Sequence, residues 1–102
     1  AGSRWQDKLL AAPCEAALEE TPEDRATRRV LNEVATERRQ QDAKWGEQNH
    51  HAGVWMLILT EEVGEAAKAA LEMHEADERA EYIQVAAVAV ARVEAIDRRT
   101  KP

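Results

Sequence analysis

The sequence predicts an all-α fold, and three observations support this prediction. Alanine, glutamate and arginine are abundant, whereas the 102 residues include only four glycines and three prolines. This composition favours helices, and β-branched residues are few outside two apolar runs. The apolar residues also recur at helical spacing. We therefore expect a small helical bundle with three long helices and a short N-terminal helical segment, completed by oligomerisation.

The chain divides into a short extension and one main domain. Residues 1–20 are expected to form the helical extension, which is interrupted at Pro13. Residues 1–3 have the composition of a remnant left by expression cloning. Residues 21–102 are expected to form the helical domain, a length that buries only a modest core.

The first long helix is expected to run from Pro22 to about Ala43. Thr21 is a suitable N-cap residue, and proline is favoured at the first helical position. The apolar stripe of this helix includes Val30 and Val34, which are separated by about one turn.

The stretch from Trp45 to Gly53 predicts a loop, because two glycines and Asn49 interrupt the helical pattern. The second long helix is expected from about Val54 to Met73 and the third from about Glu78 to Arg98. Ala76 and Asp77 are expected to form the connection between them. Connections this short imply that neighbouring helices are antiparallel.

Three carboxylates share one side of the second helix. With Glu61 at zero on a helical wheel, Glu65 lies at about 40° and Glu62 at about 100°. Taken alone, this arc is compatible with an ordinary solvated face. The repulsion between like charges at this spacing costs only about 0.2–0.5 kcal/mol per pair, which a surface helix tolerates.

The third helix favours a metal site over a solvated face. The run from Tyr82 to Ala91 is apolar apart from Gln84, so this part of the helix is expected to be buried. Glu81 stands directly before the run and shares a packing face with Gln84. A lone buried charge is costly, and the glutamates of the second helix would increase that cost. Divalent cations would offset these charges, and all-oxygen ligands favour Mg²⁺, with Mn²⁺ as a substitute.

These residues resemble a known family. The run EEVGE at 61–65, followed by EYIQ at 81–84, resembles the EExxE and ExxD signature of the all-α NTP pyrophosphohydrolase superfamily, specifically its MazG-like branch. The run ERRQQDAKWGEQNH at 37–50 resembles short MazG-like proteins. The resemblance covers about residues 30–98. It implies a homodimer or homotetramer that uses Mg²⁺ to convert (deoxy)nucleoside triphosphates to monophosphates and pyrophosphate, as housekeeping of the nucleotide pool.

The resemblance assigns roles to individual residues. Glu61, Glu62, Glu65 and Glu81 match the acidic positions and are expected to bind metal, and Glu61 and Glu62 are the expected catalytic residues. Gln84 departs from the signature, which has aspartate there. A glutamine offers a metal a carbonyl oxygen but no charge. The alternative is therefore a non-catalytic helical interaction module with a decayed site.

Five further residues are candidates for binding the nucleotide. Trp45 would stack on a base while Lys44 meets a phosphate, or Trp45 would instead anchor the loop. Asn49 would bind a base edge or ribose, although a role in loop structure is the simpler interpretation. Lys68 and Arg92 are expected to form ion pairs with neighbouring acids, and the alternative for both is that they reach phosphates.

Charge and hydropathy exclude several classes of partner. The formal net charge of −6 disfavours binding to nucleic acid, which needs a basic surface. No apolar run approaches the roughly 20 residues that span a bilayer, so no membrane partner is expected. A single cysteine, Cys14, and the absence of a signal peptide favour the cytoplasm. Arg98, Arg99 and Lys101 are expected to form a solvated basic end.

Overall fold

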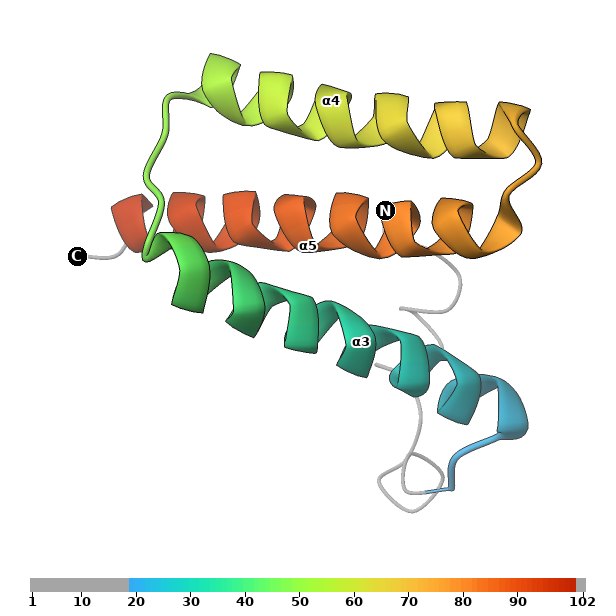
Figure 1. Ribbon diagram of the computed structural model, residues 1–102. Coiled ribbons are helices and arrows are strands. Elements are labelled where there is room, and N and C mark those ends of the chain that lie inside the picture. Colours follow the sequence, from blue (N-terminus) through green and yellow to red (C-terminus); the bar gives the residue numbers. More distant parts are fainter. Residues whose placement is uncertain (1–18, 101–102) are drawn as a thin grey trace, which may run out of the picture.

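The computed structural model describes residues 19–100, which form three helices (Figure 1). Helix α3 spans Pro22–Trp45, α4 spans Ala52–Leu71 and α5 spans Glu75–Thr100. This part of the chain contains no strand, so the predicted all-α fold is confirmed. None of its helices is long and apolar enough to cross a membrane. The predicted N-terminal extension lies almost entirely outside the described residues.

Helix α3 begins at the cap that the sequence predicts. The Thr21 hydroxyl accepts a hydrogen bond from the Asp24 backbone N–H at 3.0 Å. In return, the Asp24 carboxylate accepts one from the Thr21 backbone N–H at 3.1 Å. Pro22 occupies the start of the helix, where its missing N–H costs nothing. Two backbone donors that the helix itself leaves free are thus satisfied.

Helix α3 ends at Trp45, slightly later than expected. Gly46 follows with a φ of 74°, a left-handed value that favours glycine. Its N–H donates to the Asp42 carbonyl at 2.8 Å, which closes the last turn. Trp45, expected in the loop, is therefore a helical residue, and the loop itself comprises residues 46–51.

The predicted connection between the second and third helices is wrong, because Ala76 and Asp77 belong to α5. The turn is made by residues 72–74, where Met73 has a φ of 59°. The His74 backbone N–H donates to the Ala69 carbonyl at 3.0 Å and closes the end of α4. A glycine is the usual signal for this left-handed conformation, and a methionine is uncommon there. The sequence therefore does not mark the turn.

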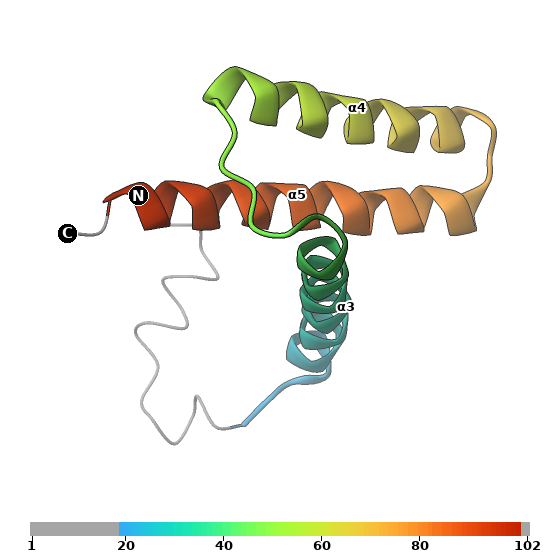
Figure 2. The same cartoon turned by 60° about the vertical axis from the view of Figure 1, so that its left-hand side comes forward.

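Helix α5 is the centre of the arrangement. Helices α4 and α5 lie side by side and antiparallel, as predicted, and α3 crosses α5 at an angle (Figures 1 and 2). Helices α3 and α4 both pack on α5 and contact each other much less. The core between α4 and α5 contains Trp55, Val88, Ala91 and Ala95, with Ile58 and Leu59 partly buried against it.

The apolar run of α5 is buried on two sides only. Ala87, Val88 and Ala91 are buried. In contrast, Tyr82 is 54% exposed and Val90 is 40% exposed. The expectation that the run is buried all round is therefore wrong for the single chain, because α3 and α4 together leave one face of α5 uncovered.

Candidate functional site

The carboxylates of α4 and α5 interact most strongly at Glu62. Burial raises the pKa of the Glu62 carboxyl, and the nearby carboxyls of Glu81, Glu61 and Glu65 raise it further. Glu62 and Glu81 are half-buried, whereas Glu61 and Glu65 are exposed. The other three predicted acids therefore lie within electrostatic range of Glu62, in line with the spacing argument.

Glu81 is less buried than the sequence predicts. Glu81 was expected to be an inward-facing, buried charge. No charged side chain in residues 19–100 is fully buried, and Glu81 keeps part of its solvent exposure. Glu81 lies in the second turn of α5, near the 72–74 turn that closes the α4–α5 hairpin. Glu62, on the α4 side of the same hairpin, is also half-buried, and burial raises the pKa of its carboxyl.

A hard divalent cation suits the donor chemistry of these residues. The raised pKa of Glu62 indicates that ionising it beside Glu81 is unfavourable. A cation relieves such repulsion, and carboxylate oxygens are preferred ligands of Mg²⁺. Within residues 19–100, no three His, Cys, Asp or Glu side chains are gathered closely enough to hold a metal ion as they stand. Glu61 and Glu65 would have to turn toward the Glu62–Glu81 pair.

A cavity of about 640 Å³ lies where α3, the 46–51 loop, α4 and α5 come together, and we call it the Glu62 cavity. Cavities of this size accommodate ligands as large as a nucleotide. Glu62 and Gln84 form one part of its lining, and Ile58 and Val88 add apolar surface. Its remaining polar lining comes from α3 and the loop, including Gln40, Gln41, Lys44, Trp45 and Gln48.

Lys44 and Trp45 line the Glu62 cavity together, as two of the predicted nucleotide-binding residues. Trp45 is 63% exposed, so it does not anchor the loop in the core. The Lys44 ammonium lies 4.9 Å from the centroid of the Trp45 ring, a cation–π contact. The positive charge of Lys44 thus lies over one face of the indole ring.

Two of the other predicted acids line a different space. Glu65, Lys68 and Glu81 line a cavity of about 220 Å³ that we call the Lys68 cavity. Among the described residues, Lys68 forms no ion pair with Glu65 or Glu72, contrary to that expectation. The exposed lysine faces water, where such a pair gains little.

Arg92 and Asn49 are not part of the Glu62 cavity lining. The Arg92 Nη1 atom is buried without a hydrogen-bond partner, so the expected ion pair is absent for this nitrogen within the described chain. Asn49 donates to the Glu47 carboxylate at 2.9 Å and accepts from Arg98 at 2.9 Å. Asn49 therefore has the structural role in the loop that was its simpler interpretation.

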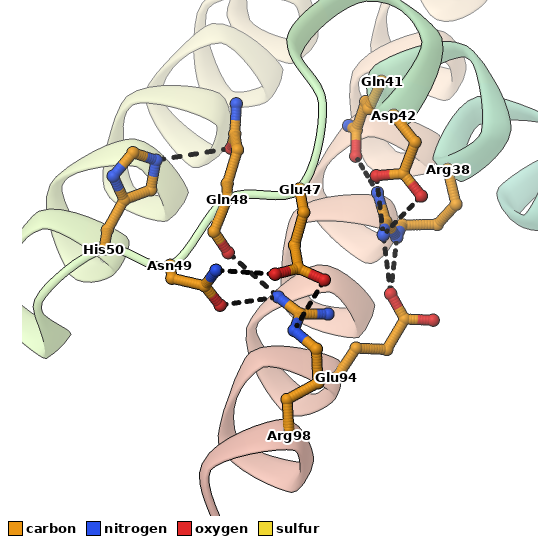
Figure 3. A network of polar contacts seen from close by, with 9 residues as sticks. All are labelled: Arg38, Gln41, Asp42, Glu47, Gln48, Asn49, His50, Glu94 and Arg98. Carbon is orange, nitrogen blue, oxygen red and sulfur yellow. Dashed lines mark hydrogen bonds and ion pairs between the residues drawn. The ribbon is translucent and has the colours of Figure 1, made fainter.

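Helical periodicity did not predict the polar network that joins α3 and the loop to α5 (Figure 3). Arg98 was expected to be solvated, but its guanidinium donates to the Gln48 carbonyl at 3.1 Å and pairs with Glu47 at 3.3 Å. One turn earlier, Glu94 accepts from Arg38 at 2.6 Å. Arg99 makes no contact of this kind among the described residues, and Lys101 lies outside them. Residues about 50 positions apart meet here, which helical periodicity alone does not reveal.

Arg38 is the most enclosed member of this network. Its side chain is 13% exposed and pairs with both Asp42 and Glu94. Burial lowers the pKa of Arg38, but the hydrogen bonds and charges of Glu94 and Asp42 outweigh burial, so the net shift is upward. Arg38 therefore stays charged, and its pair with Glu94 holds α3 against α5.

Comparison with protein-family models, curated proteins and solved structures found no match for this chain. The resemblance to the MazG-like branch therefore stays a prediction from the motifs at 61–84 and 37–50.

Proposed function

We propose that this protein is a Mg²⁺-dependent nucleoside triphosphate pyrophosphohydrolase that cuts between the α and β phosphates. The observation that carries the proposal is the lining of the Glu62 cavity. One space brings together a carboxylate of raised pKa, a lysine and an exposed tryptophan. These groups match the needs of a nucleotide, namely a site for cation-assisted chemistry, a positive charge for phosphate and a flat surface for a base.

Each side chain would contribute a separate task. The free face of Trp45 would stack on the base, since Lys44 lies over the ring. The Lys44 ammonium would meet the negative charge of the triphosphate. Glu62 would hold the cation that makes the attacking water more acidic. Glu61, exposed beside it, would position that water.

Glu62 and Glu81 would hold the cation, with Glu61, Glu65 and the Gln84 carbonyl oxygen as further ligands. When bound, Mg²⁺ would neutralise phosphate charge and make water more acidic. Within this proposal, Gln84 contributes one negative charge less than the aspartate of the signature. The site would therefore bind the cation more weakly than a site with the full set of acids.

The proposal includes assembly into a homodimer or a tetramer of dimers. Five of the eight buried apolar residues in the described chain are alanines, so the single chain buries little apolar surface. Tyr82, Val93 and Ile96 form an exposed stripe on α5, and Val93 is 56% exposed. An uncovered stripe of this kind is typical of a protein interface. Light scattering should therefore give a mass of at least two chains, and Val93→Lys should lower it.

The exposed apolar stripe also favours the second candidate function, a non-catalytic helical interaction module. This function requires the stripe but not the Glu62 cavity. The two candidates therefore differ in one measurable property, which is the turnover of nucleotide.

The test is hydrolysis of a panel of nucleoside and deoxynucleoside triphosphates with Mg²⁺, measured as release of pyrophosphate and monophosphate. Glu62→Gln should reduce kcat/KM by about a hundredfold or more, because even groups that only support a metal ligand contribute about 10–100-fold. Glu72→Gln, which removes an exposed acid from the end of α4, is the matched control and should retain activity. Absence of turnover with every nucleotide, or full activity of Glu62→Gln, would reject the proposal.

A further inference from the structure

Two glutamines in the lining of the Glu62 cavity have amide oxygens that already face a neighbouring side chain. The first is Gln41, whose Oε1 accepts a hydrogen bond from Arg38 Nη1 at 3.1 Å. An arginine can only donate, so the carbonyl end of the amide must face Arg38. Figure 3 shows the Gln41 amide nitrogen pointing away from Arg38. Gln41 therefore has N–H donors left for another partner and an oxygen already in use.

Arg38 is itself unable to turn away. Its Nε and Nη2 atoms donate to Glu94 Oε1 at 3.0 Å and 2.6 Å, and Nη2 also donates to Asp42 at 3.2 Å. The side chain is almost enclosed, with 13% exposure. The orientation of Gln41 is thus set by a chain of contacts that begins on α5.

The second glutamine is Gln48 in the loop. Its Oε1 lies 3.3 Å from His50 Nε2, so it accepts when the imidazole proton is on that nitrogen. The Gln48 backbone is held independently, because its carbonyl accepts from Arg98 at 3.1 Å. As with Gln41, the amide nitrogen is the end that points away from its partner (Figure 3).

We propose that Gln41 and Gln48 form a wall of the Glu62 cavity whose N–H donors select bases with carbonyl oxygens. This inference rests on the proposed function. Uracil and thymine present two carbonyl oxygens, O2 and O4, which accept from amide N–H groups. In adenine an amino group stands beside both N1 and N7, so its N–H would face the N–H groups of the wall. N–H donors that a bound base leaves without an acceptor are costly. A pocket that forms hydrogen bonds discriminates between bases in this way. Gln41 is the specificity-determining residue, and Arg38 is the positioning residue that orients it.

The first experiment measures binding rather than turnover. The affinities of the α,β-imido analogues of dUTP and dATP are compared by calorimetry in the presence of Mg²⁺. The wild-type protein should bind the uracil analogue about five- to tenfold more tightly, the effect expected from one net hydrogen bond. Equal affinity, a preference for adenine, or no binding of either analogue overturns the inference.

Variants at neighbouring positions separate hydrogen-bond direction from charge. Gln41→Glu replaces the N–H donors with an acceptor and should abolish or reverse the preference. Gln40→Glu places the same charge on the adjacent residue of the same cavity and should leave the ratio of affinities unchanged. Equal effects of the two variants would mean that charge, and not donor direction, controls the binding.

A third variant tests the positioning role of Arg38. Arg38→Gln can donate or accept, so it should let the Gln41 amide turn and should lower the preference at unchanged kcat. A fall in kcat together with an unchanged preference would contradict that role. Selective binding without hydrolysis would reject the enzymatic proposal and keep the wall of N–H donors. Hydrolysis without base preference would reject only the wall of N–H donors.

Discussion

The α4–α5 hairpin and the attachment of α3 to α5 are held together by different interactions. Between α4 and α5 the contact is apolar and more extensive than that between α3 and α5, with Trp55 packed among valine and alanine side chains. In the described chain, none of the ion pairs joins these two helices. Helix α3 instead reaches α5 through Val34 and two charged pairs, Arg38–Glu94 and Arg79–Glu33.

This difference divides the proposed site into two parts. The carboxylates lie on the apolar hairpin, whose packing fixes their distance from one another. Lys44, Trp45 and the glutamines lie on α3 and the loop, which polar contacts hold in place. The Arg98–Glu47 pair at the loop is partly exposed, and exposed polar contacts are weak and sensitive to salt, so the 46–51 loop can adjust to a ligand more easily than the hairpin can.

The largest expected effect comes from the two tryptophans at the Glu62 cavity. Trp55 is 3% exposed and belongs to the hairpin core. Trp55→Ala should lower the free energy of unfolding by about 3–5 kcal/mol, measured by denaturant titration followed by circular dichroism. Trp45→Ala, at a side chain that is largely exposed, should change it by no more than about 0.5 kcal/mol. Under the proposed function, Trp45→Ala would instead raise KM. Equal losses of stability in the two variants would contradict the view that only the hairpin core depends on its tryptophan.

A smaller effect is expected for the guanidinium that holds the loop. Arg98→Ala removes contacts to Glu47, Gln48 and Asn49. Under the proposed function, KM for the nucleotide should rise by about tenfold at nearly unchanged kcat, because about 1–1.5 kcal/mol of positioning is lost. Hydrogen exchange at residues 46–51 should become faster while α4 and α5 keep their protection.

Arg99→Ala is the matched control, since it removes the same charge one position along α5. Its KM and exchange should equal those of the wild type. A fall in kcat for Arg98→Ala, with KM unchanged, would mean that the loop affects the chemistry and not the placement of the nucleotide.

The smallest expected effect is a pH dependence of stability that arises at Glu62. Its pKa is raised above the ordinary value of 4.5, first by burial and then by the neighbouring acids. The folded state therefore holds this proton more tightly than the unfolded state, and ionisation disfavours folding. The penalty is absent below the ordinary value, grows as pH rises between the ordinary and the raised pKa, and is complete above the latter.

Glu62→Gln should consequently melt at a higher temperature than the wild type at neutral pH without metal. The difference should disappear as the pH is lowered below about 4.5. Adding Mg²⁺ should stabilise the wild type more than the variant, because the cation would relieve the repulsion only where the carboxylate is present. A variant that is less stable than the wild type at neutral pH would show that Glu62 contributes packing or hydrogen bonds that outweigh its charge.

The sequence by itself determined the three helices, the Thr21 cap and the grouping of acids along α4. These features depend on neighbours within about one helical turn, and periodicity and capping residues report them directly. The turn at Met73 was not predicted, because a methionine, and not the usual glycine, adopts its left-handed conformation.

Only the tertiary structure decided that Arg38 meets Glu94, that Arg98 meets the loop, and that Gln41 and Gln48 join Glu62 around one cavity. The physical reason is that a helix fixes which residues share a face but not which face meets a neighbour, nor at what height along it. That choice follows from the packing of whole helices on α5. The raised pKa of Glu62 is a local consequence of that packing, because burial between the helices is its largest cause.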